Sequence, residues 1–164
     1  MKIRNAKMKD LFEIAEIEKV CFPKEEAATE EIFQKRLERC LNYFWLLEVD
    51  KKIVGFINGI VTNEDTISDM MYEDIKMHKE DGKWLAIFGV DILPEYQHQG
   101  LASKMMEFVI KEVFKQNKAG IILTCKEKLI PFYEKFGYIN TGKSKSIHGN
   151  AVWYDMRLEI KRDM

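Results

Sequence analysis

The chain has 164 residues, which corresponds to one domain of ordinary size. Hydrophobic residues make up 46% and charged residues 32%, a balance that excludes an intrinsically disordered protein. With 26 Lys and Arg against 27 Asp and Glu, the net charge of −1 argues against a dedicated nucleic-acid-binding protein. We therefore expect a single domain over residues 1–164, with a core large enough to fold without disulfides or metals.

The cysteines and the apolar segments bear on where the protein works. Cys21, Cys40 and Cys125 are far apart and form no CxxC pair, so they predict neither a disulfide framework nor a zinc site. No apolar run approaches the ~20 residues of a membrane span. Residues 1–10 also lack the apolar stretch of a signal peptide. We expect a cytoplasmic protein with reduced thiols and without membrane or nucleic-acid partners.

The first third of the chain shows helical and then strand-like patterns. Apolar side chains recur at helical spacing after Met8, and Thr29 is a favourable N-cap for a second helix. Gly55 and Gly59 lie inside an apolar strand pattern, where isolated glycines often mark a bulge or a close backbone approach. The predicted elements are a strand at 2–6, helices at 8–20 and 29–40, and a hairpin of strands at 44–49 and 53–61.

The remainder begins with a polar, acidic stretch at residues 62–83, which predicts a loop with one short helix. An apolar strand follows and ends at Pro94, and Asp91 is the one charge among its apolar residues. The next helix is apolar over much of its circumference, which indicates a largely buried helix. The predicted elements are strands at 84–93, 121–125, 138–142 and 151–158 and helices at 100–116 and 129–136.

The element order is β-α-α-β-β-β-α-β-α-β-β. It predicts an α+β, or mixed α/β, fold with a single central mixed sheet of about six or seven strands and about four flanking helices. We expect the strand at 151–158 to expose an edge that could pair two subunits, so the chain is predicted to be a monomer or a homodimer.

The connection from Pro94 to the buried helix has the features of an anion site. The first N–H groups of a helix lack partners within the helix, and the helix dipole favours a negative charge there. Gly100 and the small Ala102 would let a phosphate approach the backbone closely. The pattern predicts a diphosphate site, although an ordinary strand–turn–helix connection has the same local features.

Two motifs resemble those of the GNAT superfamily of N-acetyltransferases. Gln97-x-x-Gly100-x-Ala102 is similar to its Q/R-x-x-G-x-G/A signature, and residues 130–138 are similar to its short helix that carries a tyrosine and ends in a glycine turn. The pattern at 21–28 and the run at 125–133 most resemble the serotonin (arylalkylamine) N-acetyltransferase branch. The resemblance extends from residue 3 to about residue 160 and is weakest at 62–83.

The resemblance implies a GNAT-like domain with acetyl-CoA as its co-substrate. The pantetheine arm would pair with backbone groups of Val90, Asp91 and Ile92, and their strand would part from the next one near Thr124. The pyrophosphate would lie at the start of the helix, where backbone groups should matter more than side chains. The residues implied there are Gln97, His98, Gln99, Gly100, Leu101, Ala102 and Ser103.

The implied reaction is attack of a neutral amine on the thioester carbonyl. The amine must lose a proton, the developing oxyanion needs donors and the thiolate must leave. The resemblance implies that the Val90 amide donates to the carbonyl and that Tyr133 is the general acid for the thiolate. A phenol with a pKa of about 10 suits that task. The alternative for Tyr133 is an ordinary amphipathic core tyrosine.

The general base stays open. The branch carries two histidines where this chain has Ala86 and Phe88, and neither residue accepts a proton. Asp91 is one candidate, but strand alternation points it away from both positions unless a bulge intervenes. Glu25 and Glu26 could face an amine or could be solvated surface carboxylates. Ordered water relaying the proton to bulk solvent is the remaining alternative.

Three further polar residues are not expected in the catalytic machinery. His78 lies in the acidic loop, where a surface role is expected, and His148 lies in a hairpin turn. Many GNAT proteins have an asparagine at the position of Lys126, so no pantetheine contact is expected from that side.

The acceptor site is expected to involve residues 21–33 and 62–83. Carboxylates beside aromatic residues suit a cationic amine with an apolar body. We predict a small primary amine, arylalkylamine-like or polyamine-like, contacted by Phe22, Glu25, Glu26 and Phe88. Other residues expected to shape the site are Phe33, Glu64, Asp65, Asp69, Met70, Tyr72, Glu73 and Asp74.

Other functions remain compatible with the sequence. A protein N-terminal or lysine acetyltransferase would use the same co-substrate on a larger acceptor. A non-catalytic acyl-CoA-binding sensor is an alternative because Ala86 and Phe88 replace the histidines of the branch. A plain interaction domain would require both motifs to be coincidental.

Overall fold

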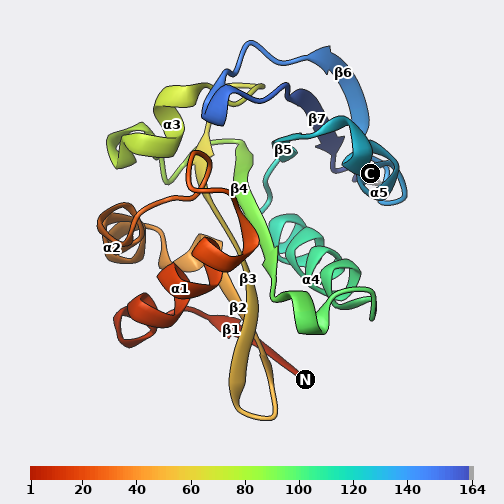
Figure 1. The fold of residues 1–164 in the computed structure, drawn as a ribbon. Coiled ribbons are helices and arrows are strands. Elements are labelled where there is room, and N and C mark those ends of the chain that lie inside the picture. Colours follow the sequence, from red (N-terminus) through yellow and green to blue (C-terminus); the bar gives the residue numbers. More distant parts are fainter. Residues whose placement is uncertain (163–164) are drawn as a thin grey trace. The chain divides into compact units, whose positions relative to one another are not determined.

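A mixed seven-stranded sheet is the framework of the computed structural model, which describes residues 1–162 (Figure 1). Its strand order is β1-β2-β3-β4-β5-β7-β6. The pair β4–β5 is parallel, while β1–β2, β2–β3, β5–β7 and β6–β7 are antiparallel. This confirms the predicted fold class. The strands are β1 (Lys2–Asn5), β2 (Phe44–Val49), β3 (Lys52–Thr62), β4 (Trp84–Ile92), β5 (Gly120–Cys125), β6 (Ile139–Lys143) and β7 (Tyr154–Glu159).

The helices begin and end close to the predicted positions. The Thr29 hydroxyl caps α2 by accepting the N–H of Ile32 at 3.2 Å. Short 3₁₀ turns lie at residues 8–10, 41–43, 75–77, 94–96, 127–129 and 148–150. No helix within residues 1–162 is both long and apolar enough to cross a membrane. The α-helices in this part of the chain are α1 (Leu11–Cys21), α2 (Glu30–Arg39), α3 (Asp69–Glu73), α4 (Leu101–Lys115) and α5 (Ile130–Glu134).

The chain forms two compact units, whose boundaries fall inside β3, β4 and α4. The first unit comprises residues 1–59 and 89–109. In it, Phe33 of α2 packs edge-on against Phe44 of β2 and Phe56 of β3, with ring centroids 6.0 and 5.6 Å apart. Figure 1 shows α1 and α2 next to each other in this unit. Phe33 is completely buried, so the expectation that it shapes the acceptor site is wrong.

The second unit comprises residues 60–88 and the chain from residue 110 onward. Here β7 pairs along its whole length with β5, from Gly120↔Glu159 to Cys125↔Tyr154, and its other edge pairs with β6. The expected free edge at residues 151–158 is therefore wrong. The apolar pattern explains the placement: β7 buries Met156 and Leu158, whereas every residue of β6 is exposed.

A bulge in β3 brings two backbones together at the end of β4. The register between β2 and β3 shifts after Leu47↔Gly55, as the strand glycine predicts. A Cβ atom on Gly55 would lie 2.3 Å from the carbonyl oxygen of Asp91. Only glycine allows β4 to approach this closely, so Gly55 fixes the position of the backbone next to the predicted pantetheine contacts.

Candidate functional site

The turn between β4 and α4 leaves open space above the start of the helix. Gly100 has a φ of +79°, and a Cβ atom built there would meet nothing within 4 Å. The helix that follows it has 15 residues, and its first N–H groups have no acceptor within the helix. An exposed glycine, free N–H groups and the positive end of a long helix are the requirements for holding a diphosphate. The residues present therefore fit the pyrophosphate of a nucleotide co-substrate.

The glutamine side chains of this turn are used to hold its shape. Gln97 Nε2 donates to the carbonyl oxygen of Ile92 at 2.9 Å, and Gln99 Nε2 donates to that of Glu95 at 3.3 Å. The first bond reaches the end of β4, and the second stays within the turn. The signature glutamine therefore ties the turn to the last residue of β4, and backbone groups and open space are what the turn presents to a ligand.

Successive residues of β4 direct their backbone N–H and carbonyl groups to opposite edges of the strand. The Asp91 carbonyl faces Gly55 of β3, and the Leu93 N–H donates to the Val54 carbonyl at 2.8 Å. Backbone groups alternate along a strand, so the N–H and carbonyl of Val90 lie on the edge away from β3. The backbone groups of Val90 are therefore available to a ligand, whereas the Asp91 carbonyl contacts β3.

The parallel pairing of β4 with β5 is short. In the described part of the chain it extends from Trp84↔Gly120 to Ala86↔Ile122, although both strands continue beyond it. If the pairing continued for two more residues beyond Ala86↔Ile122, Phe88 and Thr124 would be partners. They lie where the resemblance implies that the strands part to admit the pantetheine arm.

Tyr133 is held rigidly in α5. It is 6% exposed, and its ring packs edge-on against Phe132 at 5.1 Å and Tyr138 at 5.5 Å. Burial, together with the neighbouring Tyr133, raises the pKa of Tyr138 well above its usual range. Gly137 ends the motif with a φ of +98°. The predicted general acid is thus a fixed phenol, and its role stays a prediction.

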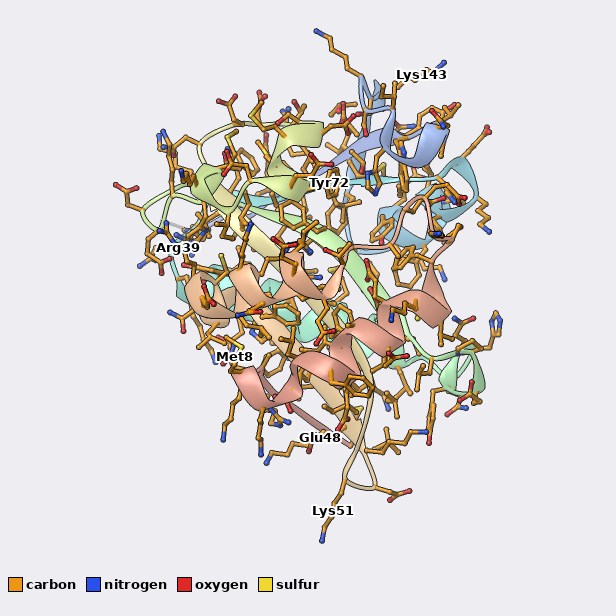
Figure 2. All side chains as sticks on the ribbon, turned by 60° about the vertical axis from the view of Figure 1, so that its left-hand side comes forward. Met8, Arg39, Glu48, Lys51, Tyr72 and Lys143 are labelled. Atoms are coloured by element: carbon orange, nitrogen blue, oxygen red, sulfur yellow. The ribbon has the colours of Figure 1, made fainter. Side chains whose placement is uncertain are left out.

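An aromatic cluster gathers around Tyr72 of α3. Its hydroxyl shares a hydrogen bond with Thr124 Oγ1 at 2.9 Å, and its ring lies 5.0 Å from Phe88 and stacks on His148 at 4.7 Å. Figure 2 labels Tyr72 beside the yellow-green ribbon of α3. The cluster joins a predicted acceptor residue, Phe88, to a predicted cofactor residue, Thr124.

The register between β5 and β7 adds a carboxylate that no sequence motif indicates. Asp155 of β7 lies directly opposite Thr124, and directly paired residues share one face of a sheet. Burial raises the pKa of Asp155, although a hydrogen bond from Ser144 opposes the shift. Neither Asp155 nor the stacking of His148 has a local sequence signal, because both depend on how β7 pairs with β5.

The loop at residues 62–83 is fastened at several points. His78 Nδ1 accepts the Val61 N–H at 2.9 Å, and its Nε2 lies 2.6 Å from Glu80 Oε2. The buried Lys118 donates to the carbonyl oxygens of Glu80 and Gly82 at 3.2 and 2.9 Å. His78 therefore fastens the loop to β3, a structural role more specific than the surface role expected from the sequence.

Two of the carboxylates expected at the acceptor site serve the loop itself. Asp69 accepts hydrogen bonds from the Ser146 hydroxyl and from the Ile147 N–H, the latter at 3.1 Å. Asp74 caps the 3₁₀ turn that follows by accepting the Lys76 N–H at 3.0 Å. Each of these carboxylates therefore has a hydrogen-bonding role within the protein itself.

The loop between α1 and α2 carries the other predicted acceptor residues. Phe22 is half-buried, and its Cε2 lies 4.0 Å from the Cβ position of Gly89 on β4. Glu25 is exposed and Glu26 is half-buried. Phe22 is therefore close to Gly89, the residue that directly precedes Val90, the predicted oxyanion donor.

Asp91 is completely buried, and its side chain faces Glu18 of α1. A proton acceptor for an amine must come within hydrogen-bonding reach of it. The buried position of Asp91 does not offer that reach.

The model of the acetyltransferase (GNAT) family matches residues 9–138. The chain belongs to this family. Membership confirms, at the level of the family, the resemblance to GNAT acetyltransferases that the two sequence motifs predicted.

The relatives are distant. The chain is 21% identical to the serotonin N-acetyltransferase of Mesocricetus auratus over 67% of its own length and 52% of that protein. It thus spans about half the length of the curated relatives it matches.

Solved structures share the fold at low sequence identity. The loading GNATL domain of CurA from Lyngbya majuscula has a TM-score of 0.84 at 18% identity and 96% coverage of both chains. The ribosomal-protein-S18-alanine N-acetyltransferase from Escherichia coli has a TM-score of 0.76 at 19% identity, covering 99% of this chain and 96% of that one. At such identities the likeness establishes the fold.

Proposed function

We propose that this protein moves the acetyl group of acetyl-CoA to a small primary amine, arylalkylamine-like or polyamine-like. The open helix start at Gly100, in the turn between β4 and α4 of a GNAT-family chain, is the observation that carries the proposal. The distant likeness to serotonin N-acetyltransferase supports an amine acceptor. Cytoplasmic location and a monomeric or homodimeric state stay predictions from the sequence.

The co-substrate supplies a thioester carbonyl and a thiolate leaving group. In the proposed mechanism, the N–H groups from His98 to Ser103 hold the diphosphate, and the Val90 N–H donates to the carbonyl oxygen as negative charge develops there. Tyr133 gives its phenolic proton to the departing sulfur. The proton lost by the amine leaves by a route to which no residue is assigned.

The proposed acceptor contacts combine aromatic surface with negative charge. Phe22 next to Gly89 and Phe88 next to Tyr72 supply apolar contact for the body of an amine. Glu25 is exposed, and Glu26 is half-buried in the same loop as Phe22. An ammonium group beside carboxylates and aromatic faces is favourably placed, which supports a cationic acceptor.

Acetylation of a protein N-terminus is the second candidate, favoured by the likeness to the S18-alanine N-acetyltransferase. A substrate panel separates the two. Purified protein is assayed for CoA release with tryptamine, phenethylamine and spermidine, and with peptides bearing a free N-terminus or an internal lysine.

We expect kcat/KM for at least one small amine to exceed that for every peptide by about tenfold or more. A higher value for a peptide would overturn the choice of acceptor. Binding of acetyl-CoA without turnover of any acceptor would favour the sensor alternative.

A further inference from the structure

The carboxyl group of Asp91 has no conventional hydrogen-bond donor around it. Its side chain is 0% exposed, and neither oxygen has a donor among residues 1–162. The group that faces it is a second carboxyl, that of Glu18 on α1, which is itself 7% exposed. Two carboxyls that meet in a dry interior do not both ionise, because the negative charges repel each other and lose their hydration.

The other polar groups packed around this pair come from α1, α2 and β3. The Cys21 thiol of α1 donates to the Ile92 carbonyl at 3.4 Å. Arg36 of α2 donates from Nη1 to Asn58 Oδ1 of β3 at 2.8 Å, and not to Asp91. Burial and the negative charge of Glu18 raise the pKa of Asp91 well above its usual range, and Arg36 opposes this less strongly.

The pair is connected to the loop between α1 and α2. Glu18 Oε2 accepts the N–H of Ala28 at 2.8 Å. Ala28 is near the end of the loop at residues 22–29, which contains Phe22, Glu25 and Glu26. Two hydrogen bonds in series, from Asp91 to Glu18 and from Ala28 to Glu18, would therefore fasten this loop to β4.

We propose that Asp91 is a positioning residue: as the neutral acid it donates its proton to Glu18, and the pair holds the loop at Ala28 in place for the acceptor. The acceptor part of this proposal rests on the proposed function. When the proton leaves for solvent at alkaline pH, two carboxylates face each other and the attachment of the loop at Ala28 loosens.

Asp91→Asn is the informative variant, since an amide keeps the shape and the donor of the neutral acid but does not ionise. At pH 7 we expect the protection of the Ala28 N–H from hydrogen exchange to stay within about threefold of that in the parent protein. In Asp91→Ala the protection should fall by about tenfold or more. As the pH is raised from neutral through the titration of Asp91, the protection should decline in the parent protein and stay level in Asp91→Asn.

Kinetics provide the second readout. The amine itself loses its proton as the pH rises, so the comparison is made between proteins: we expect the ratio of the amine KM in the parent protein to that in Asp91→Asn to rise about tenfold over the same pH range, with less than a twofold change in the corresponding ratio of kcat. Glu18→Gln gives an independent check that does not depend on the folding of Asp91→Ala, because its amide donates to an ionised Asp91 and so should also remove the alkaline change.

Asp10→Asn is the matched control, because Asp10 is also buried in the first unit. Burial opposes its ionisation, but two hydrogen bonds from Arg4, both 3.0 Å, and one from the Lys7 N–H at 2.8 Å outweigh it and lower the pKa of Asp10. We expect this variant to lose stability at pH 7 while the pH dependence at Ala28 is unchanged.

Three outcomes would overturn the proposal. If Asp91→Asn lost protection at Ala28 as Asp91→Ala does, Asp91 would be ionised in the parent protein. A carbon-13 titration of the Asp91 carboxyl with an ordinary midpoint would have the same meaning. Unchanged KM values in Asp91→Ala would remove the positioning role. Exchange and titration need no acceptor, so they test the pair even if no amine is acetylated and the proposed function fails.

Discussion

At the scale of single residues, the donors around a buried carboxyl decide its charge. Asp10 receives three hydrogen bonds, which lower its pKa, so its ionised form contributes stability above pH 3.8 that is lost as the pH falls. The contribution of Asp91 to stability depends on pH in the opposite direction. Its raised pKa means that its contribution is complete at low pH and declines as the pH rises toward that pKa. The two groups should limit stability at opposite ends of the pH range.

Tyr133 is the residue on which turnover should depend most. Its ring is fixed between Phe132 and Tyr138, so replacing it with phenylalanine removes the phenolic proton and little packing. We expect Tyr133→Phe to lower kcat by about a hundredfold, the size typical of general acid catalysis, with unchanged acetyl-CoA binding. Steady-state kinetics and a binding titration check the two parts.

Tyr138→Phe serves as the matched control for Tyr133. It removes a phenol from the neighbouring buried ring, so any general effect of loosening this cluster should appear there too. We expect its kcat to stay within about threefold of the parent value. Equal losses in both variants would show that packing of the cluster, and not proton transfer by Tyr133, is what turnover requires.

At the scale of elements, the loop at residues 62–83 depends on a lysine from outside it. Lys118 is 8% exposed and binds the carbonyl oxygens of Glu80 and Gly82. Lys118→Met keeps the apolar stem and leaves these carbonyls without that donor. We expect a loss of about 2 kcal/mol in the free energy of unfolding and a higher KM for the amine.

Chemical denaturation and separate KM values for the amine and for acetyl-CoA measure the effect of Lys118→Met. Lys115→Met, on the exposed end of α4, makes the same chemical change and should alter stability by less than about 0.5 kcal/mol. A parallel rise in both KM values would mean that the lysine supports the fold in general and not the acceptor loop.

The ends of helices and strands could be predicted from local sequence signals. Contacts between residues far apart in the sequence could not be predicted in this way. Thr29 marks the start of α2, Pro94 follows the end of β4, and the observed bounds agree with these signals. Nothing near Asp91 in the sequence indicates Glu18 as its partner. The contact requires α1 to lie over β4, which only the folded chain determines.

At the scale of the whole chain, the number and kind of elements could be predicted, but not the order of the last strands. An antiparallel hairpin at the C-terminus places either β6 or β7 beside β5, and the two choices expose different edges. Burial of Met156 and Leu158 selects β7 as the internal strand. With β7 as the internal strand, Asp155 lies opposite Thr124. Hydrophobic periodicity alone does not determine which strand is internal, so this pair could not be predicted from the sequence.

Binding of the co-substrate should be visible in the stability of the chain. Acetyl-CoA at 100 times its dissociation constant stabilises a folded protein by about 2.7 kcal/mol. For a chain of this length we expect Tm to rise by about 5–10 °C in a thermal scan. Adenosine diphosphate, which lacks the pantetheine arm, should give a smaller shift.

A pair of glycine variants locates the origin of this shift. Gly100 and Gly142 both have positive φ, +79° and +118°, and neither would bring a Cβ atom within 4 Å of another group. Gly100→Ala and Gly142→Ala therefore both strain the backbone, and Gly142→Ala is the more strained of the two because its φ lies farther from the left-handed region that other residues adopt. We expect only the Gly100 variant to lose most of the acetyl-CoA shift. An undiminished shift in it would place the diphosphate elsewhere.

The low reactivity of the buried cysteines favours a thiol-detection assay of this protein. Burial raises the pKa of both Cys21 and Cys125 to about 11, and Cys40 is almost completely enclosed. At pH 7.5 fewer than about one in a thousand of the first two thiols is ionised, and the thiolate is the form that reacts with disulfide reagents. A chromogenic disulfide added during turnover should therefore report the thiol of released CoA against a low background from the protein itself.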